Sequence, residues 1–424
     1  MMERLIGSCT VLGLLAGLAV PTLANEQREI EATDPATVHE DVVGAPGEVR
    51  TLDEPAPSLS DPLIVHWIEQ LQTELDRVET QLEQPRTTVP AGATMREGDY
   101  GPGVDLLTRR LVELGYLGEG DVRPVFDADL TAAIERFQTD TGLHVDGLVG
   151  PQTLAELNRS LEDTRLSLLW TIDQMQQLRA EAYDDMLLVN VPSTRSLLIE
   201  DGHVAMDITT AVGRYTRQTP LLQNDRIINV TLNPRWSVPS TIMREDVLPL
   251  LRAEGRTGVY DAQVFLGGEE VDPAEVDWSE IQPWQIYIRQ SPGDHSALGR
   301  YLFSLTNDQN IFIHDTNHHG VFQRANRWIS SGCIRVEDAR DLALYLIRRA
   351  GYTDEELDRR LASGVTQVMP LPEEFQVPVF VTYFTATPDG DRITYHRDIY
   401  DRTAGFQPVP PLASGGPELR GDGS

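Results

Sequence analysis

Apolar residues recur at intervals of three and four positions between residues 61 and 90, which is the spacing of one helix face. They are Ile64, Ile68, Leu71, Leu75, Val78 and Leu82. Asp61-Pro62 opens the segment, and proline fits the first position of a helix. The pattern predicts a scaffold helix that packs on the rest of the chain. A self-associating coiled coil of three heptads is the alternative.

Residues 95–158 show three further helical faces and form a predicted compact unit. The apolar positions are Val104, Leu107, Leu111 and Leu114 in the first face, and Ala133, Ile134 and Phe137 in the second. Pro151 opens the third helix. A connecting helix is predicted over 160–184.

From residue 185 the pattern changes to short apolar runs separated by turn residues, which predicts many strands. The runs are 186–191, 196–199, 204–208, 226–231, 285–288, 301–305, 311–313, 380–384 and 393–395. Asp201-Gly202 suits a tight hairpin, and residues 388–391 suit a last one. We expect an α+β multidomain chain with a β-rich domain over 185–402. An insertion at about 240–283, with a helix near 245–251, would cap it.

Composition narrows the possible partners. The net charge is −31, all 35 basic residues are arginine, and an acidic surface of this kind argues against nucleic-acid binding. Residues 25–60 and 403–424 read as disordered. Residues 1–24 resemble an export signal, with Arg4 before an apolar run. An uncleaved anchor and a lipoprotein signal are the alternatives.

The chain has two cysteines, and Cys9 lies in the predicted signal. Cys333 follows Ser330-Ser331-Gly332 and precedes helical spacing over 336–347, so turn N–H groups and a helix dipole would favour its thiolate. His314 ends an apolar run and can act as its general base. An inert buried cysteine is one alternative. A zinc site that includes His318 and His319 is another, with looser spacing.

Two segments carry a family resemblance. His314-Asp315-Thr316 and 331–336 (Ser-Gly-Cys-Ile-Arg-Val) resemble the two halves of the YkuD-type L,D-transpeptidase signature. Segments 233–239, 290–293, 298–303 and 377–383 are similar to its large periplasmic branch. Residues 95–158 resemble the type 1 peptidoglycan-binding module.

The resemblance implies 3→3 cross-linking of peptidoglycan tetrapeptide stems without a cofactor or metal. Cys333 would attack the stem, His314 would transfer protons, and Gly332 would help to bind the oxyanion. The candidate substrate contacts are Arg335, Ser331, Asp315, Thr316, Trp284 and Trp236. An ion pair of Arg335 with Glu337 or Asp338 is the structural alternative for that residue, and burial in the core is the alternative for both tryptophans.

We expect a periplasmic monomer whose contact with the membrane is limited to its export signal. A hydrolase or carboxypeptidase of the same fold remains an alternative function, as does a non-catalytic wall-binding protein. The sequence does not separate transpeptidation from hydrolysis, and the module at 95–158 could also serve as a spacer.

Overall fold

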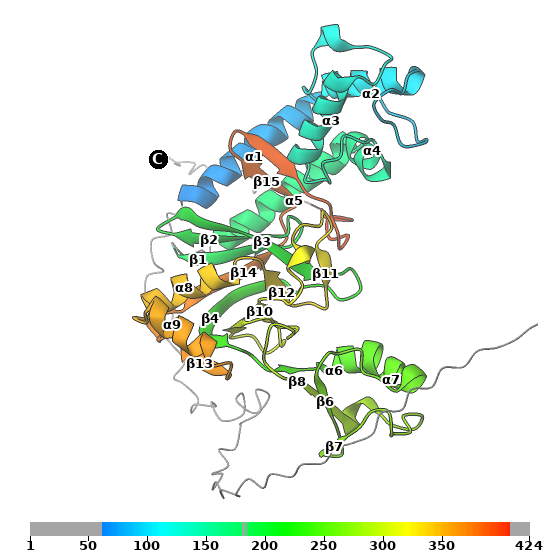
Figure 1. Cartoon of the computed structure of the whole chain (residues 1–424). Coiled ribbons are helices and arrows are strands. Elements are labelled where there is room, and N and C mark those ends of the chain that lie inside the picture. The colour runs from blue at the N-terminus through cyan, green and yellow to red at the C-terminus, as the bar shows by residue number, and fades with distance from the viewer. Residues whose placement is uncertain (1–61, 180–182, 184, 408–424) are drawn as a thin grey trace, which may run out of the picture. The chain divides into compact units, whose positions relative to one another are not determined.

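The computed structural model describes residues 62–179, 183 and 185–407 (Figure 1). The predicted export signal, the predicted linker and residues 408–424 of the predicted tail lie outside these ranges. Within the described ranges, no helix combines the length and the apolar character needed to cross a bilayer.

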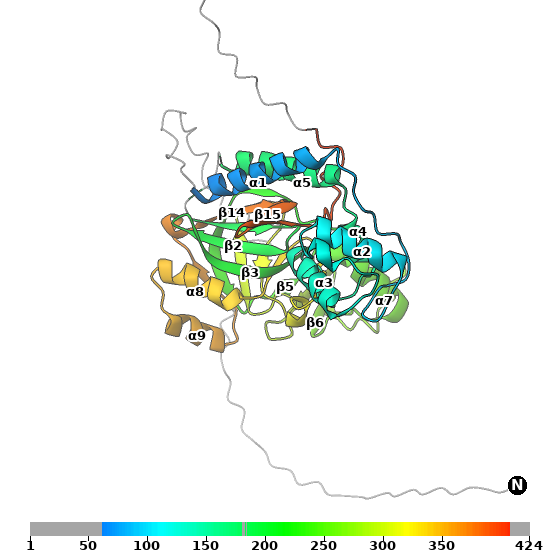
Figure 2. The same ribbon diagram turned by 90° about the horizontal axis from the view of Figure 1, so that it is seen from above.

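The predicted scaffold helix is α1 (Pro62–Gln81), and it lies beside α5 (Leu161–Arg179) (Figure 2). The apolar stripe of α1 is buried in one cluster with residues of α5 and of the main sheet, such as Leu188 and Phe380. Arg165 of α5 forms an ion pair with Glu79 of α1 at 3.0 Å. The stripe from Ile64 to Val78 is therefore used for packing within the chain, whereas Leu82 lies beyond α1 and is exposed.

The predicted three-helix unit is present. It contains α2 (Pro102–Glu113), η1 (Glu119–Asp121), α3 (Ala128–Asp140) and α4 (Pro151–Leu157). Its helices share one apolar core that includes Leu107, Ile134 and Phe137. Asp127 caps α3 by accepting a hydrogen bond from the backbone N–H of Leu130 at 3.0 Å.

A large sheet forms the β-rich domain, and its neighbouring strands run in the order β11-β3-β12-β10-β9-β4-β14-β1-β2. Because β2 also pairs with β3, the sheet closes on itself. The strands are β1 (Met186–Asn190), β2 (Arg195–Glu200), β3 (His203–Gly213), β4 (Leu222–Leu232), β9 (Tyr301–Leu305), β10 (Ile313–His314), β11 (Trp328–Ser330), β12 (Ile334–Val336), β13 (Gln367–Pro370), which pairs with β4, and β14 (Val377–Thr382).

Helices cover this sheet on two faces. α8 (Ala339–Arg349) packs through Leu342 and Leu346 against one face, and the pair α1–α5 covers the other. Strand β1 is buried along its whole length because Leu187 points to the first core and Leu188 to the second. Helix α9 (Asp354–Ala362) follows α8, and an ion pair between Arg348 and Asp354 at 2.5 Å joins the two.

The cap has its own sheet and core, in which the strands run in the order β5-β8-β6-β7. Its elements are β5 (Trp236–Ser237), α6 (Ser240–Ile242), the π-helical turn η2 (Met243–Val247), α7 (Leu248–Glu254), β6 (Ala262–Leu266), β7 (Glu269–Val271), η3 (Pro283–Gln285) and β8 (Ile286–Gln290). The predicted strand 285–288 therefore belongs to the cap and not to the main sheet. A cap confined to 240–283 was too short, because β8 supplies the partner of β6.

The last hairpin also differs from the prediction. Its strands are β15 (Ala386–Asp389) and β16 (Arg392–Tyr395), joined through Gly390. The apolar run at 380–384 was expected to form the first strand of the hairpin. Its beginning lies instead in β14, between β1 and β4 of the main sheet. A short turn, η5 (Glu373–Phe375), precedes β14.

Candidate active site

Parallel pairing of β10 with β12 brings the two halves of the signature together (Figure 1). His314 is the register partner of Arg335, and Ile313 that of Ile334. Cys333 directly precedes β12, and its Sγ lies 3.9 Å from the carbonyl oxygen of Asn310. Ile313 and Ile334 are fully buried in the core. The base candidate therefore lies on β10, and the nucleophile candidate directly precedes the neighbouring strand β12.

The helix predicted over 336–347 is present as α8, but the expectation that Cys333 stands at its start was wrong. Residues 334–336 form β12, and α8 begins only at Ala339. Ile334-Arg335-Val336 is a β-branched, alternating run, which favours a strand. Cys333 therefore precedes a strand and not the first turn of a helix.

His314 is buried, and its Nδ1 lies 2.5 Å from the carbonyl oxygen of Asp315. Burial lowers the pKa of His314 to about 3; the positive charge of Arg335 adds to this, and the bond to the Asp315 carbonyl opposes it. The imidazole is therefore neutral at pH 7. With Nδ1–H as donor to the carbonyl, Nε2 is left as the free acceptor.

The thiol of Cys333 is not disulfide-bonded and is only partly exposed. Burial raises the pKa of Cys333, although a backbone hydrogen bond with Phe312 and the charge of Arg335 oppose this. The resting site thus holds a neutral thiol and a neutral imidazole. This differs from the thiolate expected from the sequence, because desolvation exceeds the effect of the nearby donors.

The loop before Cys333 is fixed by its own hydrogen bonds. Ser330 Oγ donates to the Cys333 carbonyl at 2.6 Å and accepts from the Gly332 N–H at 3.1 Å. Gly332 has φ of +121°, a conformation that a side chain would strain. The Gly332 N–H, which we expected to face the oxyanion, is thus already engaged. Among the described residues, none accepts a hydrogen bond from the Cys333 N–H.

Arg335 carries a buried Nε atom with no hydrogen-bond partner. In the described part of the chain, no carboxylate forms an ion pair with it, so the alternative pairing with Glu337 or Asp338 is not observed. Burial also lowers the pKa of Arg335. A desolvated, unpaired guanidinium beside Cys333 is suited to an anionic ligand.

Asp315 and Thr316, two predicted substrate contacts, are buried and serve the local structure. The Asp315 carboxylate accepts hydrogen bonds from the backbone N–H groups of Arg300 at 2.8 Å and of Thr316 at 2.7 Å. This carboxylate lies against Gly299, where a Cβ atom would collide with it. These contacts hold the segment whose carbonyl orients His314.

The two predicted tryptophan contacts lie in the cap. Trp236 is partly buried against the cap core, and Trp284 in η3 is 80% exposed. Trp284 is therefore not a core residue, which was the alternative for both side chains.

The metal-site alternative has no support from the geometry. His319 faces Asp315 at 3.5 Å, and His318 precedes the short turn η4 (His319–Val321). Across the described ranges, no three His, Cys, Asp or Glu side chains gather closely enough to hold a metal ion.

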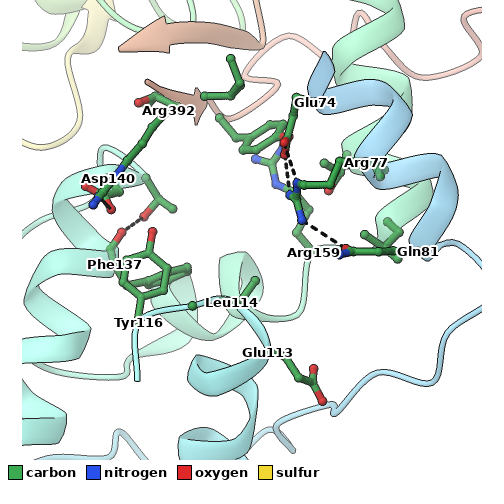
Figure 3. A pocket seen from close by; sticks show the side chains of 18 of the residues that line it. Glu74, Arg77, Gln81, Glu113, Leu114, Tyr116, Phe137, Asp140, Arg159 and Arg392 are labelled. Carbon is green, nitrogen blue, oxygen red and sulfur yellow. Dashed lines mark hydrogen bonds and ion pairs between the residues drawn. The ribbon is translucent and has the colours of Figure 1, made fainter. Parts of the chain in front are cut away.

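A cavity of about 770 Å³ lies away from the signature, lined by α1, the three-helix unit and β16 (Figure 3). Its charged side chains mostly neutralise one another. The ion pairs are Arg77–Glu74, Arg110–Glu113, Arg159–Glu156 and Arg392–Asp140. Such internal pairing leaves little unpaired charge for a ligand, and the Arg392–Asp140 pair joins the last hairpin to the three-helix unit.

The sequence reasoning missed Arg217, which donates a hydrogen bond to Ser331 Oγ at 2.9 Å. Its only signal is a basic residue in a short loop between two strand patterns, which is equally typical of a solvated turn.

Comparison with known proteins agrees with this geometry. Residues 184–351 match the L,D-transpeptidase catalytic domain named YkuD, and residues 100–157 match a putative peptidoglycan binding domain. A putative L,D-transpeptidase of Haemophilus influenzae is 37% identical over 221 residues, which are 50% of this chain and 44% of the relative. The chain thus spans less than half of that relative's length.

Among solved structures, an L,D-transpeptidase of Xylanimonas cellulosilytica shows a TM-score of 0.22 at 15% identity, over 69% of this chain and 99% of that one. An L,D-transpeptidase of Mycobacterium smegmatis shows a TM-score of 0.25 at 12% identity, over 47% and 58%. Residues 184–351, which hold both paired signature strands, are thus similar to the YkuD L,D-transpeptidase catalytic domain, and residues 100–157 are similar to a putative peptidoglycan-binding domain.

Proposed function

We propose that the chain is an L,D-transpeptidase that forms 3→3 cross-links between peptidoglycan tetrapeptide stems through a thioester on Cys333. The observation that carries this proposal is the parallel pairing of β10 with β12, which brings a buried, oriented imidazole onto the strand next to the one that follows Cys333. Cysteine suits acyl transfer because it is a strong nucleophile and a good leaving group.

In the first half-reaction, Cys333 Sγ attacks the carbonyl carbon of the third stem residue while His314 Nε2 takes the thiol proton. The neutral state of both groups means that proton transfer accompanies attack. The oxyanion rests on the Cys333 N–H. The C–N bond then breaks, His314 returns the proton to the departing D-alanine amine, and the thioester remains.

In the second half-reaction, the side-chain amine of an acceptor diaminopimelate attacks the thioester. His314 takes a proton from that amine and delivers one to Cys333 as the C–S bond breaks. Arg335 binds a stem carboxylate, which is supported by its unpaired Nε. Ser331, Trp236 and Trp284 are candidate contacts for the rest of the substrate.

We further propose the surrounding organisation of the chain. Residues 1–24 direct export to the periplasm, residues 95–158 hold the enzyme on peptidoglycan, and residues 185–402 perform the chemistry. The segments 61–90 and 160–184 act as the scaffold between them.

The test is incubation of the protein, lacking residues 1–24, with purified tetrapeptide muropeptides, followed by mass spectrometry. Transpeptidation yields cross-linked dimers with loss of D-alanine, whereas hydrolysis yields tripeptide alone. Cys333→Ala is the control and should give neither product. Binding without any product would overturn the enzymatic proposal and favour a wall-binding protein.

A further inference from the structure

Arg217 connects the cap with the loop that carries the nucleophile. It lies between β3 and β4, and its side chain is only 6% exposed. Nη1 contacts Ser331 Oγ at 2.9 Å and Asp246 at 2.7 Å, and Nη2 contacts Glu245 at 2.7 Å. One guanidinium therefore joins two residues of the cap to a residue two positions before Cys333.

The loop that carries Arg217 is held rigidly on the catalytic side. Thr219 Oγ1 donates to the Gly332 carbonyl at 2.7 Å and accepts from the Gly213 N–H at 2.8 Å. Tyr400 Oη accepts from the Thr219 N–H at 3.1 Å and donates to the Gly213 carbonyl at 2.6 Å. A Cβ atom on Gly213 would lie 2.6 Å from Thr219 N, so only glycine permits this fold of the loop. The base of Arg217 is thus fixed to the residue next to Cys333.

The cap side of the contact has an unusual backbone. Glu245 and Asp246 lie in η2, the π-helical turn between α6 and α7. A π-helical turn is wider than an α-helical one, and such turns occur frequently at functional sites. Here the turn lets two consecutive carboxylates reach the same guanidinium. Glu245 also pairs with Arg244 at 2.9 Å, whereas Asp246 has Arg217 as its ion-pair partner.

The burial of the partners is unequal. Both carboxylates are exposed and could be hydrated without Arg217, but the buried guanidinium loses its counter-charges if the cap moves away. Opening of the cap is therefore opposed at Arg217, and the same residue bonds the hydroxyl of Ser331. The position of the cap and the conformation of the loop 331–333 are linked through one side chain.

We propose that Arg217 is a positioning residue that couples docking of the cap to the geometry of the Cys333 loop, so that the thioester meets an amine in a closed site. The proposal rests on the proposed acyl-transfer function. A docked cap excludes water and favours the amine, and loss of the coupling favours hydrolysis.

The experiment compares Arg217→Gln, Asp246→Asn and the double variant with the parent protein. Each is assayed for the dimer-to-tripeptide ratio from muropeptides and for amide exchange in 240–254 and 328–336. Arg217→Gln should lower the ratio about tenfold, the equivalent of one lost charge-assisted hydrogen bond. It should speed exchange in both segments. The double variant should be no worse than Arg217→Gln, because the contact that Asp246→Asn weakens is already lost in Arg217→Gln.

Arg217→Lys tests the shape of the contact, since an ammonium lacks the planar fork that reaches three partners. It should restore the ratio only in part. Arg348→Gln removes the remote pair with Asp354 on α8 and should leave the ratio unchanged.

Three results would overturn the coupling: additive effects in the double variant, faster exchange confined to one segment, or an unchanged ratio in Arg217→Gln. If the parent protein made no product at all, the proposed function would fail instead. The rate of amide exchange in residues 328–336 of Asp246→Asn would still decide whether the cap and the loop are coupled: faster exchange supports the coupling, and unchanged exchange contradicts it.

Discussion

The carbonyl oxygen of Asp315 accepts the Nδ1 proton of His314, the residue directly before it in the chain. The backbone thus fixes the ring without a carboxylate orienter, as in a triad whose third member is a peptide group. The group that orients the ring is therefore the carbonyl of Asp315 itself.

Acid should destabilise the fold through His314. Its pKa is about 3 in the folded chain and about 6.5 when unfolded, so the unfolded state binds more protons between these values. Stability is then lost as the pH falls through this window, by about 1 kcal/mol per pH unit from this residue. Urea unfolding between pH 7 and pH 4 should show a steeper loss in the parent than in His314→Gln. Equal slopes would contradict a neutral, buried imidazole.

Substitutions of Cys333 and of His314 should have different effects on turnover and on thiol reactivity. Cys333→Ala should abolish acyl transfer and leave folding intact. His314→Ala should lower turnover by about 10²- to 10⁴-fold, the usual contribution of a general base. Its thiol should still react slowly with iodoacetamide at high pH, above the ordinary thiol pKa, because burial raises the pKa of Cys333 and ionisation is then unaided. If neutral-pH alkylation were the same in the parent and in His314→Ala, the imidazole would not activate the thiol.

Carbapenems should acylate the enzyme, because a thioester-forming cysteine can open a strained amide. Intact mass should increase by one drug molecule, and peptide mapping should place it on Cys333. Cys333→Ala is the control. An unmodified parent after long incubation would argue against an accessible nucleophile.

Removing the cap should change the dimer-to-tripeptide ratio more than it changes the acylation of Cys333. Ser237 pairs with Arg289 in antiparallel register, so residues 238–288 can be replaced by an Asn-Gly hairpin turn without cutting through the cap core. We expect Cys333 to remain acylable by a carbapenem while products shift from dimer toward tripeptide, since water reaches the thioester. A ratio equal to that of the parent would remove the cap from the mechanism.

Gly299→Ala should lower both stability and turnover, although Gly299 is not itself a candidate catalytic residue. Gly299 has φ of +63°, and its Cβ would meet the Asp315 carboxylate. Backbone strain and overpacking together predict a loss of roughly 2–4 kcal/mol in unfolding free energy. Turnover should fall as well. Gly120→Ala, at a position with open space and ordinary φ, should change stability by less than about 0.5 kcal/mol.

Short sequence patterns predicted which segments form turns and strands better than they predicted which strands pair with each other. Asp201-Gly202 forms the expected tight turn, with φ of +49° and +71°, because residues tolerant of positive φ identify such turns on their own. By contrast, the sequence of residues 285–290 does not by itself indicate that β8 pairs with the cap strand β6. Pairing depends on which distant strand offers a free edge, and this is decided by the whole chain.

In the candidate site, too, some features could be predicted from the sequence and others could not. The signature residues could be chosen from thiol chemistry and family resemblance, but not the unpaired state of Arg335 or the engaged N–H of Gly332. The state of the thiol was misjudged because desolvation depends on tertiary packing. Arg217 was missed because its partner Ser331 lies 114 positions away.

The place of β14 has a consequence for biosynthesis. This strand lies between β1 and β4, although it is made almost 200 residues after β1. The sheet cannot close until residues 377–382 have been synthesised, so the emerging chain holds β1 to β13 without their central partner. Folding dominated by such distant pairings is slow and begins late. The nascent catalytic domain therefore stays open for nearly its entire translation, and a chain ending before Val377 should not assemble the sheet on which His314 and Cys333 meet.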